Sequence, residues 1–284
     1  MISQATGKKF DTRAGIRTGI RTGTRPGVRG AVVAGVIVAL FFSTAAAESL
    51  ESFLLPGIDI RRAELDAGKW CRYLVVDEAD GIIDSMIVYV AVLGTENIDG
   101  TEWFWLEFES APVGSGADDH DVTRVLLSST IQDLSRGDSL YHYVREMYVR
   151  RGTEPVSAAD PRDLKRLTLT DPTSDDDWHI GEPESLETRM GPIVCARKEL
   201  LLEESREIPA GRVKISQYRR DHFVVWTSQE VPIFGLVRCI IERERESKTI
   251  PSLPGIPEAG RRTSRVTTVL LGHGDDARPL ITIH

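Results

Sequence analysis

The chain has 284 residues, with 35 lysines and arginines against 43 aspartates and glutamates, and a formal net charge of −8 at pH 7. Seven of the basic residues and one of the acidic residues precede Glu48, so the remainder carries a formal net charge of about −14. Nucleic acids and anionic lipid surfaces require a cationic protein footprint, and this charge argues against either as the partner.

The N-terminus has the order of a secretory signal. Residues 1–29 contain only basic residues and one aspartate as charges, and residues 30–47 form an apolar run, GAVVAGVIVALFFSTAAA, that ends in small residues. This order predicts a signal peptide over 1–47, cleavage after Ala47, and a periplasmic or secreted protein. The alternative is an uncleaved membrane anchor, because the run is about long enough to cross a bilayer. In both cases residues 48–284 lie on the non-cytoplasmic side of the membrane.

Residues 48–284 predict a single β-rich domain that begins with a series of hairpins. Five segments are rich in β-branched and aromatic residues: Trp70–Val76, Met86–Leu93, Trp103–Phe108, Val122–Thr130 and Leu140–Arg150. Turn formers separate them, among them Asp80-Gly81 and Asn97–Gly100. Short strands on short connections predict antiparallel pairing rather than βαβ units.

A long loop, residues 152–187, follows, with a short helix as a candidate over Ala158–Leu167. The next predicted strands are Ile193–Leu202, Arg212–Tyr218, Phe223–Ser228, Leu236–Glu244 and Arg265–Leu271, with Leu280–Ile283 as a candidate closing strand. Residues 250–262, rich in proline and glycine, form a second predicted loop. The sequence therefore predicts about ten or eleven strands in one sheet.

Strand alternation gives the main indication of function. In Trp103–Phe108 the period of two places Trp103, Trp105 and Glu107 on one face and Phe104, Leu106 and Phe108 on the other. A sheet that is apolar on both faces must be covered on both, either by its own loops or by a bound molecule. If a ligand is bound, the candidate lining residues are Tyr89, Trp103, Trp105 and Trp226.

The three cysteines, Cys71, Cys195 and Cys239, each lie in an apolar stretch. Two interpretations stay open: buried thiols that behave as small hydrophobic residues, or one disulfide with one thiol left over. A reactive or metal-binding thiol is disfavoured because no pair has the CxxC spacing of a metal site.

The sequence contains no motif for nucleophilic, metal or phosphate chemistry, so we expect no enzyme activity and no cofactor. The acidic and histidine clusters Asp118–Asp121, Asp175–His179 and His273–Asp276 lie in predicted loops, and we interpret them as solvated surface rather than metal sites. The charged run Arg243–Lys248 is interpreted as the protected edge of the sheet.

Four segments carry a family resemblance. They are Gly68–Tyr73, the stretch Gly94–Leu106, the IPAGRV stretch Ile208–Val213, and Val225–Arg238, in which Pro232 and Gly235 predict a bend across a sheet edge. They resemble functionally uncharacterised secreted bacterial proteins, which are in turn similar to the LolA and LolB lipoprotein-carrier fold. The resemblance implies a strongly curved antiparallel half-barrel, with few short helices and long covering loops, that holds acyl chains or other apolar molecules without catalysis.

Two hypotheses about function follow. The first is an exported protein that binds or carries a lipid or another apolar ligand in the cell envelope. The alternative is a structural or interaction module of the periplasm, with an envelope protein as partner and a contact surface on the loop 152–187. Neither involves nucleic acid, and the membrane is contacted only through the N-terminal segment if that segment stays attached.

Overall fold

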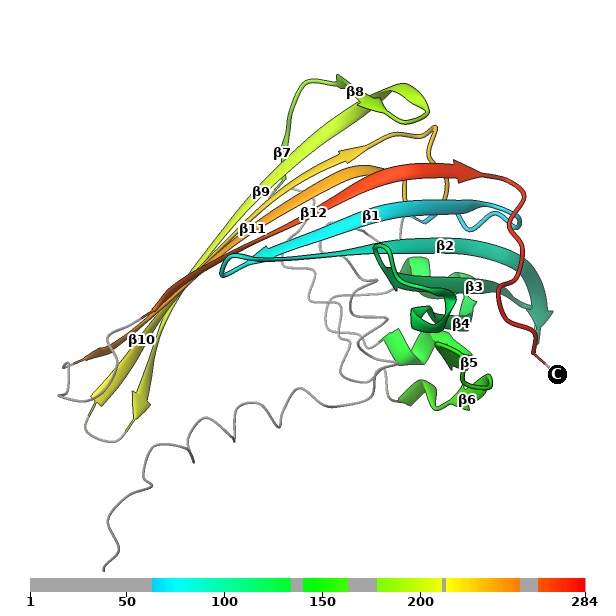
Figure 1. Ribbon diagram of the computed structural model, residues 1–284, viewed down its shortest axis with the longest axis horizontal. Coiled ribbons are helices and arrows are strands. Elements are labelled where there is room, and N and C mark those ends of the chain that lie inside the picture. The colour runs from blue at the N-terminus through cyan, green and yellow to red at the C-terminus, as the bar shows by residue number, and fades with distance from the viewer. Residues whose placement is uncertain (1–62, 134–139, 163–177, 211–212, 251–259, 284) are drawn as a thin grey trace, which may run out of the picture. The chain divides into compact units, whose positions relative to one another are not determined.

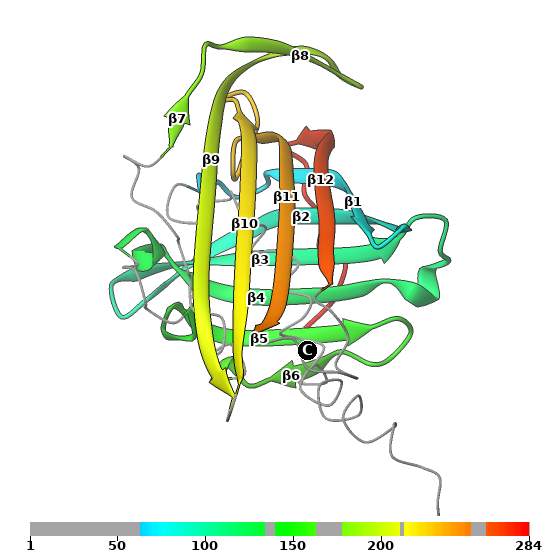
Figure 2. The ribbon, with the colours of Figure 1, turned by 90° about the vertical axis from the view of Figure 1, so that its left-hand side faces the viewer.

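The computed structural model describes residues 63–133, 140–162, 178–210, 213–250 and 260–283. These residues form one open sheet of 12 antiparallel strands, which curves strongly and does not close into a barrel (Figure 1, Figure 2). The predicted fold class, a mainly β protein with one curved antiparallel sheet, is confirmed. The predicted signal over 1–47 lies outside the described residues.

The first half of the sheet is a run of neighbouring hairpins. Its strands are β1 (Trp70–Ala79), β2 (Ile82–Ile98), β3 (Thr101–Pro112), β4 (Asp121–Ser128), β5 (Val144–Arg151) and β6 (Ser157–Ala159). Three short 3-10 helices interrupt it: η2 (Ala117–Asp119), η3 (Ser129–Asp133) and η4 (Leu140–Tyr143). The turns at Asp80-Gly81 and Asp99-Gly100 have positive φ at both residues, which matches the right-handed twist of a two-residue hairpin.

The second half contains longer strands. They are β7 (His179–Ile180), β8 (Glu184–Thr188), β9 (Gly191–Ala210), β10 (Val213–Thr227), β11 (Leu236–Ile250) and β12 (Arg261–Gly274). The order across the sheet is β6-β5-β4-β3-β2-β1-β12-β11-β10-β9-β7, and β8 pairs with β9. Because β12 pairs with β1, the first and last long strands lie side by side near the middle of the sheet.

Several predicted boundaries are wrong. The predicted segments Arg212–Tyr218 and Phe223–Ser228 are joined in one strand, β10, because Arg219–His222 between them pair in register with Leu201–Glu204 of β9 and Glu242–Arg245 of β11. The run Arg243–Lys248 is not at an edge, since β11 lies between β10 and β12. Leu280–Ile283 forms no strand.

The predicted loops are shorter than expected. β6 and β7 form within residues 152–187, β8 begins there at Glu184, and β12 already begins at Arg261. The candidate helix over Ala158–Leu167 begins instead with the end of β6, and residues 163–177 lie outside the described ranges. Residues 251–259 of the second predicted loop also lie outside them.

One face of the sheet, which we call the inner face, holds the core. On β1 and β3 it carries Tyr73, Leu106 and Phe108, and on β11 it carries Cys239 and Ile241, all at most 5 % exposed. The 3-10 helices pack Ile131 and Leu140 against the same core, and the sheet curves around them (Figure 1). We call the opposite face the outer face.

Candidate functional site

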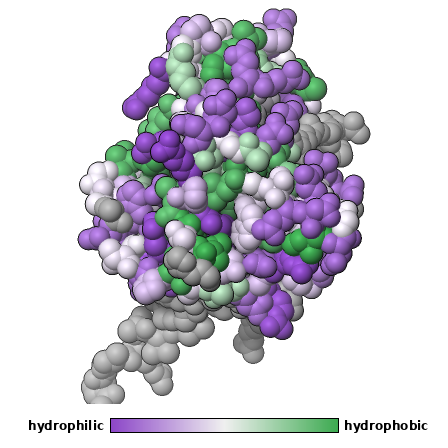
Figure 3. Space-filling model, turned by 90° about the vertical axis from the view of Figure 1, so that its right-hand side faces the viewer, coloured by the Kyte–Doolittle hydropathy of each residue, from purple (hydrophilic) through white to green (hydrophobic). Residues whose placement is uncertain are grey.

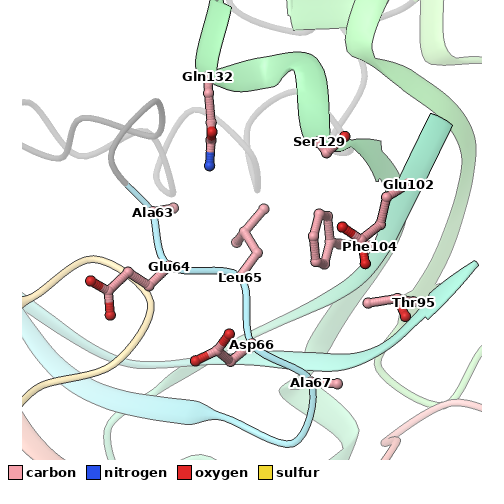
Figure 4. A pocket seen from close by; sticks show the side chains of 10 residues that line it. All are labelled: Ala63, Glu64, Leu65, Asp66, Ala67, Thr95, Glu102, Phe104, Ser129 and Gln132. Atoms are coloured by element: carbon pink, nitrogen blue, oxygen red, sulfur yellow. The ribbon is translucent and has the colours of Figure 1, made fainter.

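An open cavity of about 630 Å³ lies on the inner face, beside the paired ends of β2 and β3 (Figure 4). Its ten lining residues are Ala63, Glu64, Leu65, Asp66, Ala67, Thr95, Glu102, Phe104, Ser129 and Gln132. The Leu65 side chain and the Phe104 ring point toward one another across the opening, and Gln132 reaches toward it from η3 (Figure 4). Both apolar side chains pack against the core cluster, so the floor of the cavity continues the core.

The segment before β1 is held in place by backbone hydrogen bonds. The Glu64 N–H donates to the Ile233 carbonyl at 2.8 Å, and the Gly68 N–H donates to the Val92 carbonyl at 2.7 Å. Between these two bonds the side chains alternate, so that Leu65 is buried while Asp66 is exposed. The segment therefore supplies both an apolar wall and an acidic rim.

A wide connection between β10 and β11 covers the neighbouring part of the inner face. The Ser228 N–H donates to the Gly235 carbonyl at 2.8 Å, which closes the connection. Ile233, only 1 % exposed, reaches into the core with φ of +66°, a conformation that a β-branched residue rarely adopts. The Cys71 thiol donates to the Pro232 carbonyl at 3.2 Å. The predicted edge crossing at Pro232 is therefore wrong, because the segment links two adjacent inner strands.

The cavity lining combines acidic, polar and apolar groups. Its rim carries the carboxylates of Glu64, Asp66 and Glu102 and the polar groups of Thr95, Ser129 and Gln132. Polar residues are therefore the majority, and the apolar part is the floor at Leu65 and Phe104 together with two alanines. A concave site with an apolar floor and polar rim groups is typical of a binding site for a small molecule.

All four predicted lining aromatics lie on the outer face by strand alternation, and three of them lie on β2 and β3; Trp226 follows Val225, which is in register with Cys239 of the inner face. Trp103 and Trp105 alternate with Phe104 along β3, and Tyr89 is paired in register with Glu109 of the same face. The Trp105 indole donates to Glu96 Oε1 at 2.6 Å, and the guanidinium of Arg145 lies 5.9 Å from the Trp103 ring. The structure thus gathers three aromatics on one face, opposite the cavity.

Trp226 lies apart from the other three, on β10. The guanidinium groups of Arg197 and Arg238 lie 5.9 Å and 5.4 Å from its ring centroid, and its indole N–H donates to Glu184 of β8. These contacts fasten β8 to the sheet. The ligand-lining role of Tyr89, Trp103, Trp105 and Trp226 stays a prediction, whereas Phe104, which the sequence did not single out, lines the cavity.

A buried ion pair holds the C-terminal segment on the outer face. Glu107 is fully buried and accepts hydrogen bonds from Arg124 at 2.6 and 3.0 Å. The Leu280 N–H donates to Glu107 Oε1 at 2.6 Å, and Arg124 donates to the Ile281 carbonyl. The predicted strand at Leu280–Ile283 is replaced by this contact, since the backbone pairs with side chains instead of with a neighbouring strand.

No protein-family model matches this chain. No curated protein matches it either. Among solved structures it is similar to a protein from Parabacteroides distasonis provisionally named a lipoprotein, at 12 % identity and a TM-score of 0.30. It is also similar to a provisionally named exported protein with a YmcC-like fold from Bacteroides fragilis, at 11 % identity and a TM-score of 0.28. Each match covers 74 % of this chain and 96 % of the other. We draw no conclusion on function from TM-scores of this size.

The three cysteines are buried thiols. Burial raises the pKa of Cys71 and of Cys239 to about 12, and it also raises the pKa of Cys195. Across the described residues no three histidine, cysteine or acidic side chains gather in a way that could hold a metal ion. Two of the predicted loop clusters contribute hydrogen bonds, from Trp70 to Asp276 at 2.8 Å and between His120 and Glu109 at 2.6 Å. Residues 175–177 of the third lie outside the described ranges.

Proposed function

We propose that this is an exported, non-enzymatic protein that binds a lipid or another apolar ligand in the cavity beside Phe104. The observation that carries the proposal is the cavity itself. Its volume of about 630 Å³ falls within the range of small-molecule sites, about 300 to 1,000 Å³, and its apolar floor joins the core. The cavity is open rather than enclosed.

Two further observations support the proposal. The basic and apolar order of residues 1–47 favours export through a secretory signal. The curved open sheet, with short helices and connecting segments on its inner face, agrees with what the resemblance to the lipoprotein-carrier fold implies. Within the described residues no helix is long and apolar enough to cross a membrane.

We also propose that the cavity catalyses no reaction. Among the lining residues the hydroxyl of Ser129 and the carboxylates of the rim have no histidine or lysine to complete a catalytic pair. We therefore assign binding alone to the cavity, with no cofactor and no metal ion.

The test compares adjacent residues on opposite faces of β3. The full-length gene is expressed for export, and the purified protein is titrated with N-phenyl-1-naphthylamine, a neutral apolar fluorophore. Phe104→Ala should weaken binding about tenfold, because the ring forms the cavity floor. Trp105→Ala should leave the affinity unchanged. Native mass spectrometry with organic extraction would show a co-purifying apolar molecule.

The opposite results are equally informative. A loss of affinity only in Trp105→Ala would place the ligand on the outer face, where the sequence-predicted aromatics lie. If the fluorophore does not bind and the mass spectrum shows the protein alone, the binding proposal fails.

A second candidate function, a structural or interaction module, has its own supporting observation. Leu65, Ile131, Leu140 and Ile233 already fill much of the inner face, and each is at most 7 % exposed. The described part of the protein surface does not favour this second candidate, because it offers no large continuous hydrophobic patch to a protein partner. The exposed large hydrophobic residues lie mostly near strand ends, apart from Leu201 in the middle of β9, and the face drawn in Figure 3 shows hydrophobic residues in separate patches between hydrophilic ones.

A further inference from the structure

The charged run in β11 separates its charges by sign. The sequence Arg243-Glu244-Arg245-Glu246 alternates, and side chains of a strand point alternately to the two faces. Val237, Cys239 and Ile241 of the same strand are buried in the core, so the odd-numbered residues Arg243 and Arg245 continue the inner face. The glutamates take the outer face. This alternation with a period of two places arginines and glutamates on opposite faces, and the interpretation of the run as a protected edge did not take it into account.

Neighbouring strands extend this cationic surface. Arg245 is in register with Arg219 of β10 and with Arg262 of β12, which makes a row of three arginines across three strands. Arg243 is in register with Asp221 and Ser264. On β9–β12 this part of the inner face carries five arginines and two acidic residues: Arg206, Arg219, Arg243, Arg245 and Arg262 with Glu204 and Asp221.

The outer face of the same strands is neutralised by ion pairs. Arg261 lies 2.8 Å from Glu244, Lys248 lies 2.6 Å from Glu246, and Lys214 lies 2.8 Å from Glu207. The long ends of β9–β12, which we call the ribbon, therefore differ between their two faces. The charges on the outer face are matched in number, whereas the inner face has an excess of cations.

Among the described residues on the inner face of these strands, Asp221 is the acid that forms an ion pair; it is 1 % exposed and accepts a hydrogen bond from Arg219 at 2.6 Å. Its second carboxylate oxygen is buried without a hydrogen-bond partner, and so is Nε of Arg243. Within the described part of the chain, Arg243, Arg245 and Arg262 make no ion pair. These groups form a polar site with unfilled hydrogen-bonding capacity.

A row of like charges is unfavourable for the sheet itself. Directly opposed cationic side chains on paired strands have Cβ atoms about 5 Å apart and destabilise the pair. An oxyanion removes that repulsion, because the planar guanidinium forks of arginine bind phosphate and carboxylate groups through paired hydrogen bonds. The arrangement is therefore explained by an anionic ligand better than by folding.

The neighbouring residues indicate what else the ligand contains. One step toward the core on the same face, β11 and β12 present Ile241 and Val266, and β9 presents Leu202 beside Asp221. We propose that the inner face of β9–β12 binds the phosphate group of an anionic amphiphile, with Arg243, Arg245 and Arg262 at the phosphate and the apolar part over Leu202 and Val266, which are half-buried, whereas Ile241 is already covered by the core. This site is separate from the cavity at Phe104 and does not depend on it.

The overall negative charge is compatible with this site. A net charge of −8 repels a broad anionic surface such as a membrane, but one phosphate group lies within a Debye length of the arginines and feels them most strongly. The expected ligand is a single molecule rather than a lipid surface.

The experiment uses n-octyl phosphate as the probe, titrated into the full-length protein by isothermal titration calorimetry at low salt. The test variant is the double substitution Arg245→Gln and Arg262→Gln, in which both residues are exposed. The matched control is Arg261→Gln with Arg265→Gln, which removes the same charge from the outer face. We expect about tenfold or more weakening in the test variant and less than twofold in the control.

A stability measurement keeps a folding defect from imitating this result. Because the test variant removes like-charge repulsion, its Tm should stay the same or rise by up to about 3 °C. A fall in Tm would mean that the arginines serve the fold, and it would overturn the proposal.

Other probes define the remaining outcomes. If octyl glucoside binds as tightly as octyl phosphate, the phosphate group is not recognised. If inorganic phosphate binds as tightly as octyl phosphate, the apolar chain is not recognised. Either result would overturn the proposed amphiphile site. Binding only to phosphatidylglycerol vesicles would overturn it in favour of a membrane surface. If Phe104→Ala weakens octyl phosphate binding and the arginine variant does not, this site is refuted while the cavity proposal stands.

Discussion

The two halves of the sheet differ in the exposure of their ion pairs. In the half formed by β1–β5, Glu107 is completely buried against Arg124, with the C-terminal segment across the pair. In the half formed by β9–β12, Asp221 is buried against Arg219, but most pairs are open to solvent: the Arg261 side chain, which pairs with Glu244, is 65 % exposed. The same interaction thus occurs in two very different dielectric environments.

The difference shows how each half is held together. The first half has cover on both faces, so its strands are stabilised by packing and its charges must be fully satisfied. The long ends of β9–β11 extend beyond the core, and their side chains are mostly exposed. There the backbone ladder and cross-strand charge pairs maintain the strands. The effects of substitutions should therefore fall steeply from the first half to the second.

The largest effect is expected at the buried pair. Glu107→Ala leaves Arg124 as an uncompensated buried charge and removes the acceptor of two backbone N–H groups, so the free energy of unfolding should fall by about 3 to 5 kcal/mol. Urea unfolding measures this loss. As a control, Glu107→Leu with Arg124→Met should recover most of it, since it removes both charges. A single-variant loss below about 1 kcal/mol would contradict a tightly held pair.

The next effect concerns the connection that covers the inner face. Ile233→Ala should lower the free energy of unfolding by about 2 to 5 kcal/mol, because it leaves a cavity among buried neighbours. Chemical denaturation of the variant tests this. The matched control is Ile208→Ala at the exposed end of β9, which should cost less than about 0.5 kcal/mol. Equal losses at both positions would remove the contrast between the core-facing connection and the exposed strand ends of the same half.

The buried thiols predict a pH effect. Above pH 9 the thiols of the unfolded chain lose their protons, while Cys71 and Cys239 keep theirs up to about pH 12. The unfolded state then binds fewer protons, so stability falls as pH rises from about 9 to 12. At pH 10 each thiol contributes about 1.4 kcal/mol of this loss. Urea unfolding at pH 8 and pH 10 should show a smaller loss for Cys239→Ala than for the unmodified chain, and identical losses would refute the assignment.

The smallest effect is expected on the outer face of the ribbon. Arg261→Gln breaks an exposed pair with Glu244, and such pairs contribute about 0 to 1 kcal/mol, less at high salt. Thermal unfolding in low and high salt tests this. Lys248→Gln is a suitable comparison, since it breaks a similar exposed pair in the neighbouring strand. A loss above about 2 kcal/mol would mean that the ribbon is held as tightly as the first half.

The sequence predicts the fold class and the hairpin turns because these depend on local signals. Asp80-Gly81 marks a turn through its backbone preferences alone. The length of β10 is not predictable in the same way, since Arg219–His222 gain strand structure from partners on β9 and β11 that are distant in sequence. Periodicity identifies local faces, whereas pairing across the sheet requires the structure.

The candidate site was only half predictable. Alternation separates Trp103 and Trp105 from Phe104, but it does not say which set faces the cavity when both are apolar. That choice depends on the curvature of the whole sheet and on the segment around Leu65, which has no sequence motif. The separation of arginines from glutamates in β11 was visible in the sequence, and only the register with Arg219 and Arg262 makes it a surface.

The pairing of β1 with β12 has a consequence for how the molecule assembles. Each half contains hairpins between consecutive strands, which can form as soon as their residues are available. The central pair joins residues about 200 positions apart, from Trp70 with Gly274 to Ala79 with Ser264. In a chain synthesised or threaded from its N-terminus, the two halves can therefore join only after β12 has emerged, long after the hairpins of the first half can form.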